Sequence, residues 1–253
     1  MHVLVVMRLV PDTSEDVEID ASGVDIDREW VDLKLCEFDD HALEEAILLK
    51  ERAGAKVTAI AIAGEGVDRM LQTATARGAD QCIRIDYELD NPTSTAEAAK
   101  VVAEAIRSIG ADLVLTGVLT TEDVLGQWAP FIAGCLGWPT VNAVSGIEAG
   151  GKGVIVRQEY SGGRSSRLDV PFPAVLGVQS ASQPPRYVPG SKLRQAMGTP
   201  IEAKTIDVIV TGRSGTITAL AAPEGAHHAN MIDGDAEAVA SAIADILAER
   251  SLV

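Results

Sequence analysis

Aromatic side chains are scarce in this sequence. Phe, Trp and Tyr together make up 4% of the 253 residues, although 47% of the residues are hydrophobic. A core without large rings must be built from Ala, Val, Ile and Leu, and such a core suits helices packed on a parallel sheet. A chain of this length predicts one or two domains, with a core that needs no disulfide or metal to fold.

Cysteines and long apolar runs are also lacking. Only three cysteines occur, Cys36, Cys82 and Cys135, far apart in the chain. This odd number excludes a disulfide framework and a zinc pattern and favours a reducing compartment. No apolar run reaches the roughly 18 residues of a membrane span, and the first residues lack a signal-peptide cleavage pattern. We therefore expect a cytoplasmic protein without direct membrane insertion.

Basic residues are outnumbered, 21 against 37 acidic ones, which gives a net charge of −16. This balance disfavours binding to nucleic acid or to an anionic membrane. No GxGxxG or GxxxxGK[S/T] motif occurs, and no acid–base pair or nucleophile arrangement predicts a catalytic residue. Residues 161–166 resemble a pyrophosphatase loop but lie between strand-like runs, which predicts a hairpin turn. His227 and His228 lack a third ligand at suitable spacing, so no metal site is predicted.

Strand-like and helix-like segments alternate along the first half of the chain. The predicted strands lie at residues 3–7, 56–63, 81–85 and 112–116. The predicted helices lie at residues 39–53, 67–77, 95–109 (capped by 92–94) and 127–136. This order is typical of a parallel sheet, with right-handed crossovers that put helices on both faces. In the first helix we expect Leu43, Ala46 and Ile47 to be buried, and Glu44 and Glu45 to face water.

The remaining segments follow other patterns. Residues 15–35 are either two edge strands or a loop. Four β-like runs, at residues 141–147, 153–160, 164–170 and 174–178, are predicted as antiparallel additions to the sheet. After Gln179 the regular pattern is lost, and the tandem Pro184 and Pro185 exclude a central strand. Residues 204–234 offer little for a core and are interpreted as an arm, followed by an amphipathic helix at 235–251.

The sequence therefore predicts an α/β fold with a mostly parallel sheet, antiparallel additions and an extended C-terminal arm. Its predicted parts are residues 1–180, 181–203 and 204–253. In open parallel sheets, ligands bind beyond the carboxyl ends of the strands, which points to loops 8–13, 63–65 and 117–128. The last loop precedes a helix whose N-terminal N–H groups suit a phosphate, and Gly126 would allow close backbone approach. A plain βα loop with an acidic cap is the alternative.

Five stretches of the sequence together resemble the β subunit of electron transfer flavoproteins. They are residues 8–13, 39–51, 77–80, 117–139 and 185–187, in the order and at the spacing of that family. The resemblance implies an α/β domain of the adenine-nucleotide-hydrolase type, paired with an α subunit. FAD would be shared between the two chains, and the β subunit would hold AMP or a second FAD. Such a protein carries electrons from flavin dehydrogenases to an acceptor and converts no substrate alone.

The resemblance also implies binding residues. The nucleotide site would comprise Val6, Cys36, Glu37, Phe38, Asp39, Ala63, Gly117, Val118, Leu119, Thr120, Thr121, Glu122, Asp123, Val124, Leu125, Gly126, Gln127 and Trp128. A recognition loop for partner dehydrogenases would comprise Pro185, Arg186, Tyr187, Val188, Pro189, Gly190, Ser191, Lys192 and Leu193. Residues 204–253 would form the arm and a helix that pack on the α subunit.

Some residues depart from the family pattern. Trp128 stands where AMP-binding members usually carry a Thr that meets the phosphate. Residues 122–125 also differ from the loop of electron-bifurcating members, and Gly190 stands where a Leu anchor is typical. AMP, FAD and an empty pocket therefore all remain open. The alternative function is a stand-alone nucleotide-binding or sensor protein, or a structural protein, of the same fold that has lost flavin.

Overall fold

The computed structural model describes residues 1–14, 17–89, 94–123, 125–210, 217–222, 229 and 231–252. The chain divides into two compact units, Met1–Leu220 and Ala221–Val253. The predicted boundaries at residues 180 and 203 stay predictions.

The first unit is built on a nine-stranded sheet in the described part of the chain. Its strands are β1 (His2–Val6), β4 (Lys56–Ile62), β5 (Gln81–Asp86), β6 (Leu113–Gly117), β7 (Thr140–Ala149), β8 (Gly153–Tyr160), β9 (Arg164–Pro171), β10 (Ala174–Val178) and β11 (Glu202–Thr205). Their order is β11-β5-β4-β1-β6-β10-β7-β8-β9. The strands from β11 to β7 run parallel, whereas β8 and β9 each pair antiparallel with the preceding strand. Two short strands, β2 (Leu9–Pro11) and β3 (Leu33–Leu35), form a separate antiparallel pair.

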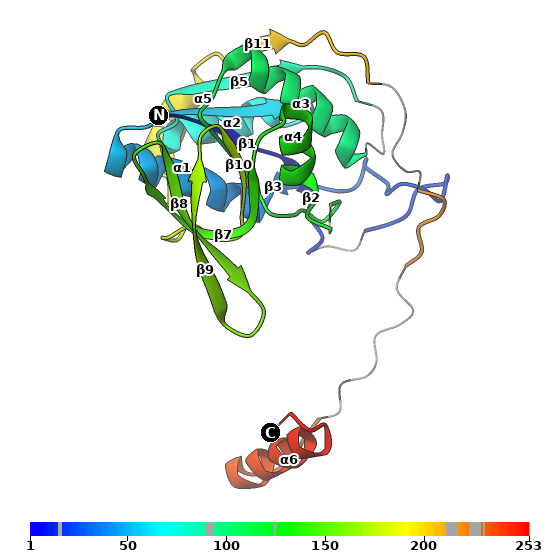
Figure 1. The fold of residues 1–253 in the computed structure, drawn as a ribbon. Coiled ribbons are helices and arrows are strands. Elements are labelled where there is room, and N and C mark those ends of the chain that lie inside the picture. Colours follow the sequence, from blue (N-terminus) through cyan, green and yellow to red (C-terminus); the bar gives the residue numbers. More distant parts are fainter. Residues whose placement is uncertain are drawn as a thin grey trace. The chain divides into compact units, whose positions relative to one another are not determined.

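Helices cover both faces of the sheet (Figure 1). α1 (Glu37–Ala53) and α2 (Val67–Arg77) pack on one face, and α3 (Thr95–Ile109) and α4 (Trp128–Leu136) pack on the other. Both layers of the core consist mainly of Ala, Val, Ile and Leu, as the composition predicts. The predicted α/β class with a mostly parallel sheet is therefore confirmed.

Local signals place the ends of several helices. α2 and α3 have the predicted bounds. Gly78 ends α2, and its N–H donates to the carbonyl oxygen of Ala74 (3.1 Å). α3 begins with a capping box, in which Glu97 N donates to Ser94 Oγ (3.2 Å) and Ser94 N to Glu97 Oε2 (3.3 Å). The other two predicted cap residues, Pro92 and Thr93, lie outside the described residues.

The prediction of four antiparallel additions is wrong for two of the runs. β8 and β9 are antiparallel and form a hairpin that extends from the sheet in Figure 1, but β7 and β10 run parallel to β6. The chain returns after β9 and inserts β10 between β6 and β7. All five residues of β10 are buried, which is typical of a central parallel strand.

The exposure expected for two carboxylates of α1 is also wrong. Glu44 and Glu45 are 1% and 0% exposed, although the apolar stripe of α1 is buried as predicted. Their face of the helix is covered by the chain that follows β10, because Ser182 N and Arg186 N donate to these two carboxylates. The helical pattern alone could not show this covering segment.

Regular structure continues beyond residue 179. α5 (Gly190–Met197) packs against α2, and β11 adds a parallel strand beside β5. Ile206 is buried in the core on the α3 side, and Val208 and Val210 pack against it. The first residues of the predicted arm are thus part of the first unit.

The second unit contains α6 (Ala236–Glu249). Asp235 caps this helix by accepting a hydrogen bond from Ala238 N (2.9 Å). None of the described residues of this unit is buried, and the pair His227 and His228 lies outside the described residues. Among the described residues, no helix has the length and apolarity that crossing a membrane requires.

Candidate functional site

The order of the strands reverses at β1. From β1 the chain continues to β4 and β5 on one side and then returns to β6 on the other side. In open α/β sheets, ligands bind beyond the carboxyl ends of the strands at such a point. A cavity of about 1040 Å³ lies there, lined by residues that follow β1, β4, β5 and β6.

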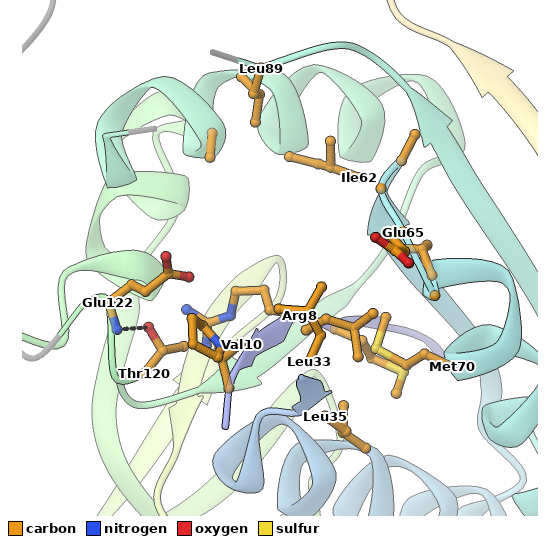
Figure 2. Close-up of a pocket in the computed structure, with 18 of the residues that line it drawn as sticks. Arg8, Val10, Leu33, Leu35, Ile62, Glu65, Met70, Leu89, Thr120 and Glu122 are labelled. Atoms are coloured by element: carbon orange, nitrogen blue, oxygen red, sulfur yellow. Dashed lines mark hydrogen bonds between the residues drawn. The ribbon is translucent and has the colours of Figure 1, made fainter. Parts of the chain in front are cut away.

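Side chains of contrasting character surround this cavity (Figure 2). The labelled ones are Leu89 and Ile62 on one side, Arg8, Val10, Leu33 and Leu35 on the opposite side, Thr120 and Glu122 at one end, and Glu65 and Met70 at the other. The lining thus combines apolar side chains with many charged and polar ones, and in small-molecule sites the polar groups fix the orientation of the ligand.

A buried carboxylate joins three segments beside the cavity. Asp39, in the first turn of α1, accepts hydrogen bonds from Arg8 N (2.9 Å), Arg8 Nε (2.9 Å) and Arg8 Nη2 (2.8 Å). It also accepts one from Gly117 N (2.6 Å) at the end of β6. A Cβ at Gly117 would lie 2.6 Å from Asp39 Oδ1 and from Phe38 Cβ. This glycine is therefore needed for the close approach of β6 to α1.

Arg8 also contacts the first residue of α4. Its guanidinium carbon lies 5.0 Å from the centroid of the Trp128 ring, a cation–π arrangement. Burial acts to lower the pKa of the Arg8 guanidinium, but the charge and hydrogen bonds of Asp39 outweigh burial and raise that pKa. Trp128 is 4% exposed, and its Nε1 has no hydrogen-bond partner among the described residues.

The loop between β6 and α4 carries its own acidic cap. The Asp123 carboxylate accepts hydrogen bonds from Gln127 N (3.1 Å) and Trp128 N (3.0 Å). Thr120 Oγ1 in turn accepts one from Asp123 N (2.8 Å). Two N–H groups at the start of α4 that would suit a phosphate are thus bonded within the chain, which is the geometry of a βα loop with an acidic cap.

Gly126 serves the packing of this loop. Its φ is +63°, and an added Cβ would lie 2.9 Å from the carbonyl oxygen of Val118. Its own carbonyl oxygen accepts a hydrogen bond from Asn142 Nδ2 in β7 (2.9 Å). The close backbone approach expected at Gly126 is therefore made to the chain itself.

The cavity includes part of the predicted nucleotide site. The predicted residues that line it are Val6, Ala63, Thr120, Glu122, Asp123 and Trp128. The predicted residues that do not line it are Cys36, Glu37, Phe38, Asp39, Gly117, Val118, Leu119, Thr121, Leu125, Gly126 and Gln127. Val124 lies outside the described residues. Asp39 does not line the cavity, but it holds Arg8, which does. The ligand-binding roles of all these residues stay predictions.

Sequence reasoning missed several parts of the lining, among them residues of α2 and α3. Residues 26–35, part of the segment 15–35 for which the pattern predicts edge strands or a loop, contribute a wall that includes Arg28 and Leu33. Glu88, Leu89 and Ser94 line the cavity from the connection between β5 and α3. The rule that ligands lie beyond strand ends applies to β5 as well, so this connection could have been included.

Negative charge predominates around the cavity. Arg8 is paired with Asp39, and Arg28 is paired with Asp25 (3.0 Å) and Glu122 (3.0 Å). Among the described residues, Arg69 is a lining cation that makes no ion pair. The acidic lining residues are Glu29, Asp32, Glu65, Glu88, Glu122 and Asp123. The described residues contain no cluster of side chains suited to a metal ion.

The predicted recognition loop lies away from the cavity, at the start of α5. Pro189 caps this helix, and Gly190, Ser191, Lys192 and Leu193 form its first turn. Before it, Pro185, Arg186 and Val188 are half-buried, whereas Tyr187 is 87% exposed. The residues are contiguous on one surface, and their role in docking stays a prediction.

The fold and the cavity together define an α/β protein with a cavity of about 1040 Å³ at the switch point of a parallel sheet. The chain matches the electron transfer flavoprotein domain over residues 24–208. It is 27% identical to the electron transfer flavoprotein subunit beta of Methylophilus methylotrophus, over 98% of each chain.

Proteins of the same name from Syntrophomonas wolfei and Thermoanaerobacterium thermosaccharolyticum are each 32% identical. These alignments cover 74% of this chain and 73% and 71% of those relatives. The chain belongs to the electron transfer flavoprotein family, and its resemblance to the β subunits is confirmed. Membership implies electron transport, association with a flavin and an α-subunit partner.

Proposed function

We propose that this chain is the β subunit of a heterodimeric electron transfer flavoprotein. With its α subunit it holds FAD, accepts electrons from flavin dehydrogenases and passes them to a downstream acceptor. The cavity of the β chain holds AMP or a second FAD. The observation that carries the proposal is the cavity at the sheet's switch point in a member of this family. The free cysteines favour the cytoplasm as its location.

The size of the cavity fits an adenine nucleotide. Its volume of about 1040 Å³ is at the upper end of the roughly 300–1,000 Å³ common for ligand pockets. Trp128 lines the cavity, and its Nε1 is a buried donor without a hydrogen-bond partner among the described residues. A ligand oxygen or nitrogen would satisfy this donor only if the ring turned toward the cavity. The N–H groups of Gln127 and Trp128 are already used by Asp123, so a phosphate would need other donors.

The residues of the chain would bind and shield the ligand rather than react with it. The apolar wall, which includes Val6 and Ile62, would exclude water, and Trp128, held against Arg8, would orient a ring system. When bound, the flavin supplies the redox chemistry. No side chain is assigned a catalytic step.

Co-production with the α subunit from the same organism tests the proposal. We expect a yellow heterodimer on size exclusion whose flavin absorbance is bleached, without oxygen, by a flavin dehydrogenase and its substrate. Mass spectrometry of the released small molecules should show FAD together with AMP if the β chain holds AMP. If the β chain holds a second FAD, it should show more FAD per heterodimer than one shared site accounts for, and no AMP. A colourless protein that acquires no flavin with the α subunit would contradict the proposal.

A stand-alone nucleotide-binding or sensor protein is the second candidate. The acidic cap favours the loss of flavin in this alternative, because Asp123 occupies the helix N-terminus where the phosphate of a flavin nucleotide would bind. In that case the purified chain would bind an adenine nucleoside or nucleotide without any α subunit and would remain colourless.

A further inference from the structure

One wall of the cavity belongs to a segment that has no core of its own. Residues 17–35 supply several lining side chains, among them Arg28, Glu29 and Leu33, which is labelled in Figure 2. None of the residues from 17 to 35 is buried. The segment thus covers part of the cavity without being packed into the first unit.

The other walls belong to the packed core. Val6 after β1, Met70 on α2, Ala98 on α3 and Trp128 on α4 all line the cavity and are at most 9% exposed. Moving any of these residues would disturb the close packing between the sheet and its helices. Local opening of a protein instead involves the parts with few buried apolar contacts. Residues 17–35 are therefore the wall that can move.

Hydrogen bonds within this segment preserve its shape. Asp27 N donates to the carbonyl oxygen of Glu18 (2.9 Å), and Asp20 N donates to that of Asp25 (2.9 Å). These bonds fold the segment back on itself, and they do not involve the rest of the chain. The segment can therefore move as one piece.

Few bonds join this piece to the rest of the first unit. At its base, β3 pairs with β2. Away from the base, two bonds among the described residues hold it. Arg28 Nη2 donates to Glu122 Oε1 (3.0 Å), and Leu220 N donates to the carbonyl oxygen of Gly23 (2.8 Å). The first bond connects the segment with the loop after β6, at the end of the cavity where Figure 2 shows Glu122.

The ion pair between Arg28 and Glu122 has the properties of a latch. The two side chains are 33% and 46% exposed, and an ion pair in such a position contributes little stability. It can therefore break without unfolding any part of the core. On the opposite side of the cavity, Arg8 is held by Asp39, which has no exposed surface. The two ion pairs thus differ in how readily they open.

We propose that residues 17–35 form a flap over the ligand cavity, and that the ion pair between Arg28 and Glu122 is the latch that keeps the flap closed. The ligand enters and leaves when this pair breaks and the flap turns away about the β2–β3 pair. The proposal rests on the proposed function for the identity of the ligand, an adenine nucleotide. It adds the route by which that ligand reaches a cavity whose other walls are packed.

Labelling of a thiol inside the cavity tests the flap in the full chain without any ligand. Ala98→Cys places the thiol in the lining of the cavity, and the neutral, bulky reagent N-phenylmaleimide must pass the flap to reach it. In this background, Arg28→Gln and Glu122→Gln should each raise the labelling rate of residue 98 about twofold to fivefold, because each removes the exposed ion pair. Mass spectrometry of the peptides separates this thiol from the native cysteines.

A change in charge alone would give a different pattern. Arg28→Gln removes a positive charge near the thiol and Glu122→Gln removes a negative one, so their effects on the ionisation of the thiol would be opposite. Glu29→Gln is the matched control, because Glu29 also lines the cavity from this segment but makes no ion pair among the described residues. It should leave the rate nearly unchanged. Any result other than a faster rate in both latch variants would overturn the latch.

Release of a bound nucleotide tests whether the flap controls ligand exchange. The probe is ethenoadenosine monophosphate, a fluorescent analogue of AMP. Both latch variants should bind and release it about twofold to fivefold faster, so that Kd changes less than either rate. An unchanged release rate would show that the ligand leaves by another route and would overturn the control of exchange by the flap. If the full chain binds none of this analogue, the AMP part of the proposed function fails, whereas the labelling rates still decide whether the latch holds the flap.

Discussion

At the start of α1, a single carboxylate accepts hydrogen bonds from the ends of two central strands. Asp39 bonds to Arg8 after β1 and to Gly117 at the end of β6, and it has no exposed surface. Arg8 in turn lies against Trp128, which lines the cavity. At the residue scale, therefore, the shape of the cavity depends on a charge pair next to it as well as on the residues that line it.

Asp39→Asn should destabilise the protein strongly. The amide keeps the shape of the side chain but leaves the Arg8 charge without its partner, and breaking a buried pair in this way typically costs about 3–5 kcal/mol. Urea denaturation followed by circular dichroism measures the change in the free energy of unfolding. Glu104→Gln, at a surface pair, is the matched control and should have little effect. Equal stability of the two variants would show that Asp39 is dispensable.

Cys36 should resist alkylation in the folded protein. Burial, followed by the nearby Asp39 carboxylate, raises the pKa of this thiol to about 11. At pH 8 only about one thiol in a thousand is then ionised, and the thiolate is the reactive form. Burial raises the pKa of Cys82 as well, whereas Cys135 is partly exposed. Iodoacetamide labelling read by mass spectrometry should therefore modify Cys135 first, and all three cysteines only after denaturation. Early labelling of Cys36 would mean that the start of α1 opens readily.

At the element scale, local signals determine helix ends well and strand partners poorly. The bounds of α2 and α3 follow from Gly78 and from the Ser94 capping box, which are signals carried within a few residues. The position of β10 between β6 and β7 depends on pairing with residues distant in the sequence, so the run at 174–178 could not reveal its direction. The same limit applies to the site. The loop after β6 was predictable from the strand rule, and its cap by Asp123 is a local contact that matches the alternative of an acidic cap. The wall from residues 26–35 arises from tertiary contacts and could not be predicted in this way.

A pair of glycine substitutions tests how closely β6 approaches α1. In Gly117→Ala the new methyl group would lie 2.6 Å from Asp39 Oδ1 and from Phe38 Cβ, so α1 must shift. We expect a loss of about 1–3 kcal/mol, as is typical of overpacking. Gly134→Ala is the matched control within α4, since nothing lies within 4 Å of its added Cβ. That change should stabilise the protein by about 0.5–1 kcal/mol, because alanine favours the helix. Thermal unfolding measures the stability of both variants. A loss of stability in Gly134→Ala as large as that in Gly117→Ala would contradict the steric argument.

At the scale of the whole molecule, the two units differ in how their apolar surface is covered. The first unit buries its Ala-, Val-, Ile- and Leu-rich core between the sheet and its helices. None of the described residues of the second unit is buried, and Ile243 and Ile246 of α6 are 46% and 43% exposed. An amphipathic helix gains most of its stability in proteins from packing of its apolar face. The second unit is thus the part of the chain that most needs a partner, which the proposed function supplies as the α subunit.

Removing residues 221–253 should leave the stability of the first unit unchanged and weaken its assembly with the α subunit. Because no described residue of that unit is buried, the shortened chain keeps every described core residue of the first unit, and its urea midpoint should match that of the full chain. Binding to the α subunit, measured by size exclusion and titration calorimetry, should weaken because the exposed isoleucines of α6 are lost. Ile243→Ser combined with Ile246→Ser in the full chain should weaken binding in the same direction, whereas Asp245→Ser, on the same helix, should not. If the shortened chain unfolds at a lower urea concentration than the full chain, residues 221–253 contribute to the stability of the first unit. A shortened chain that binds the α subunit normally would show that the arm is not the contact we propose.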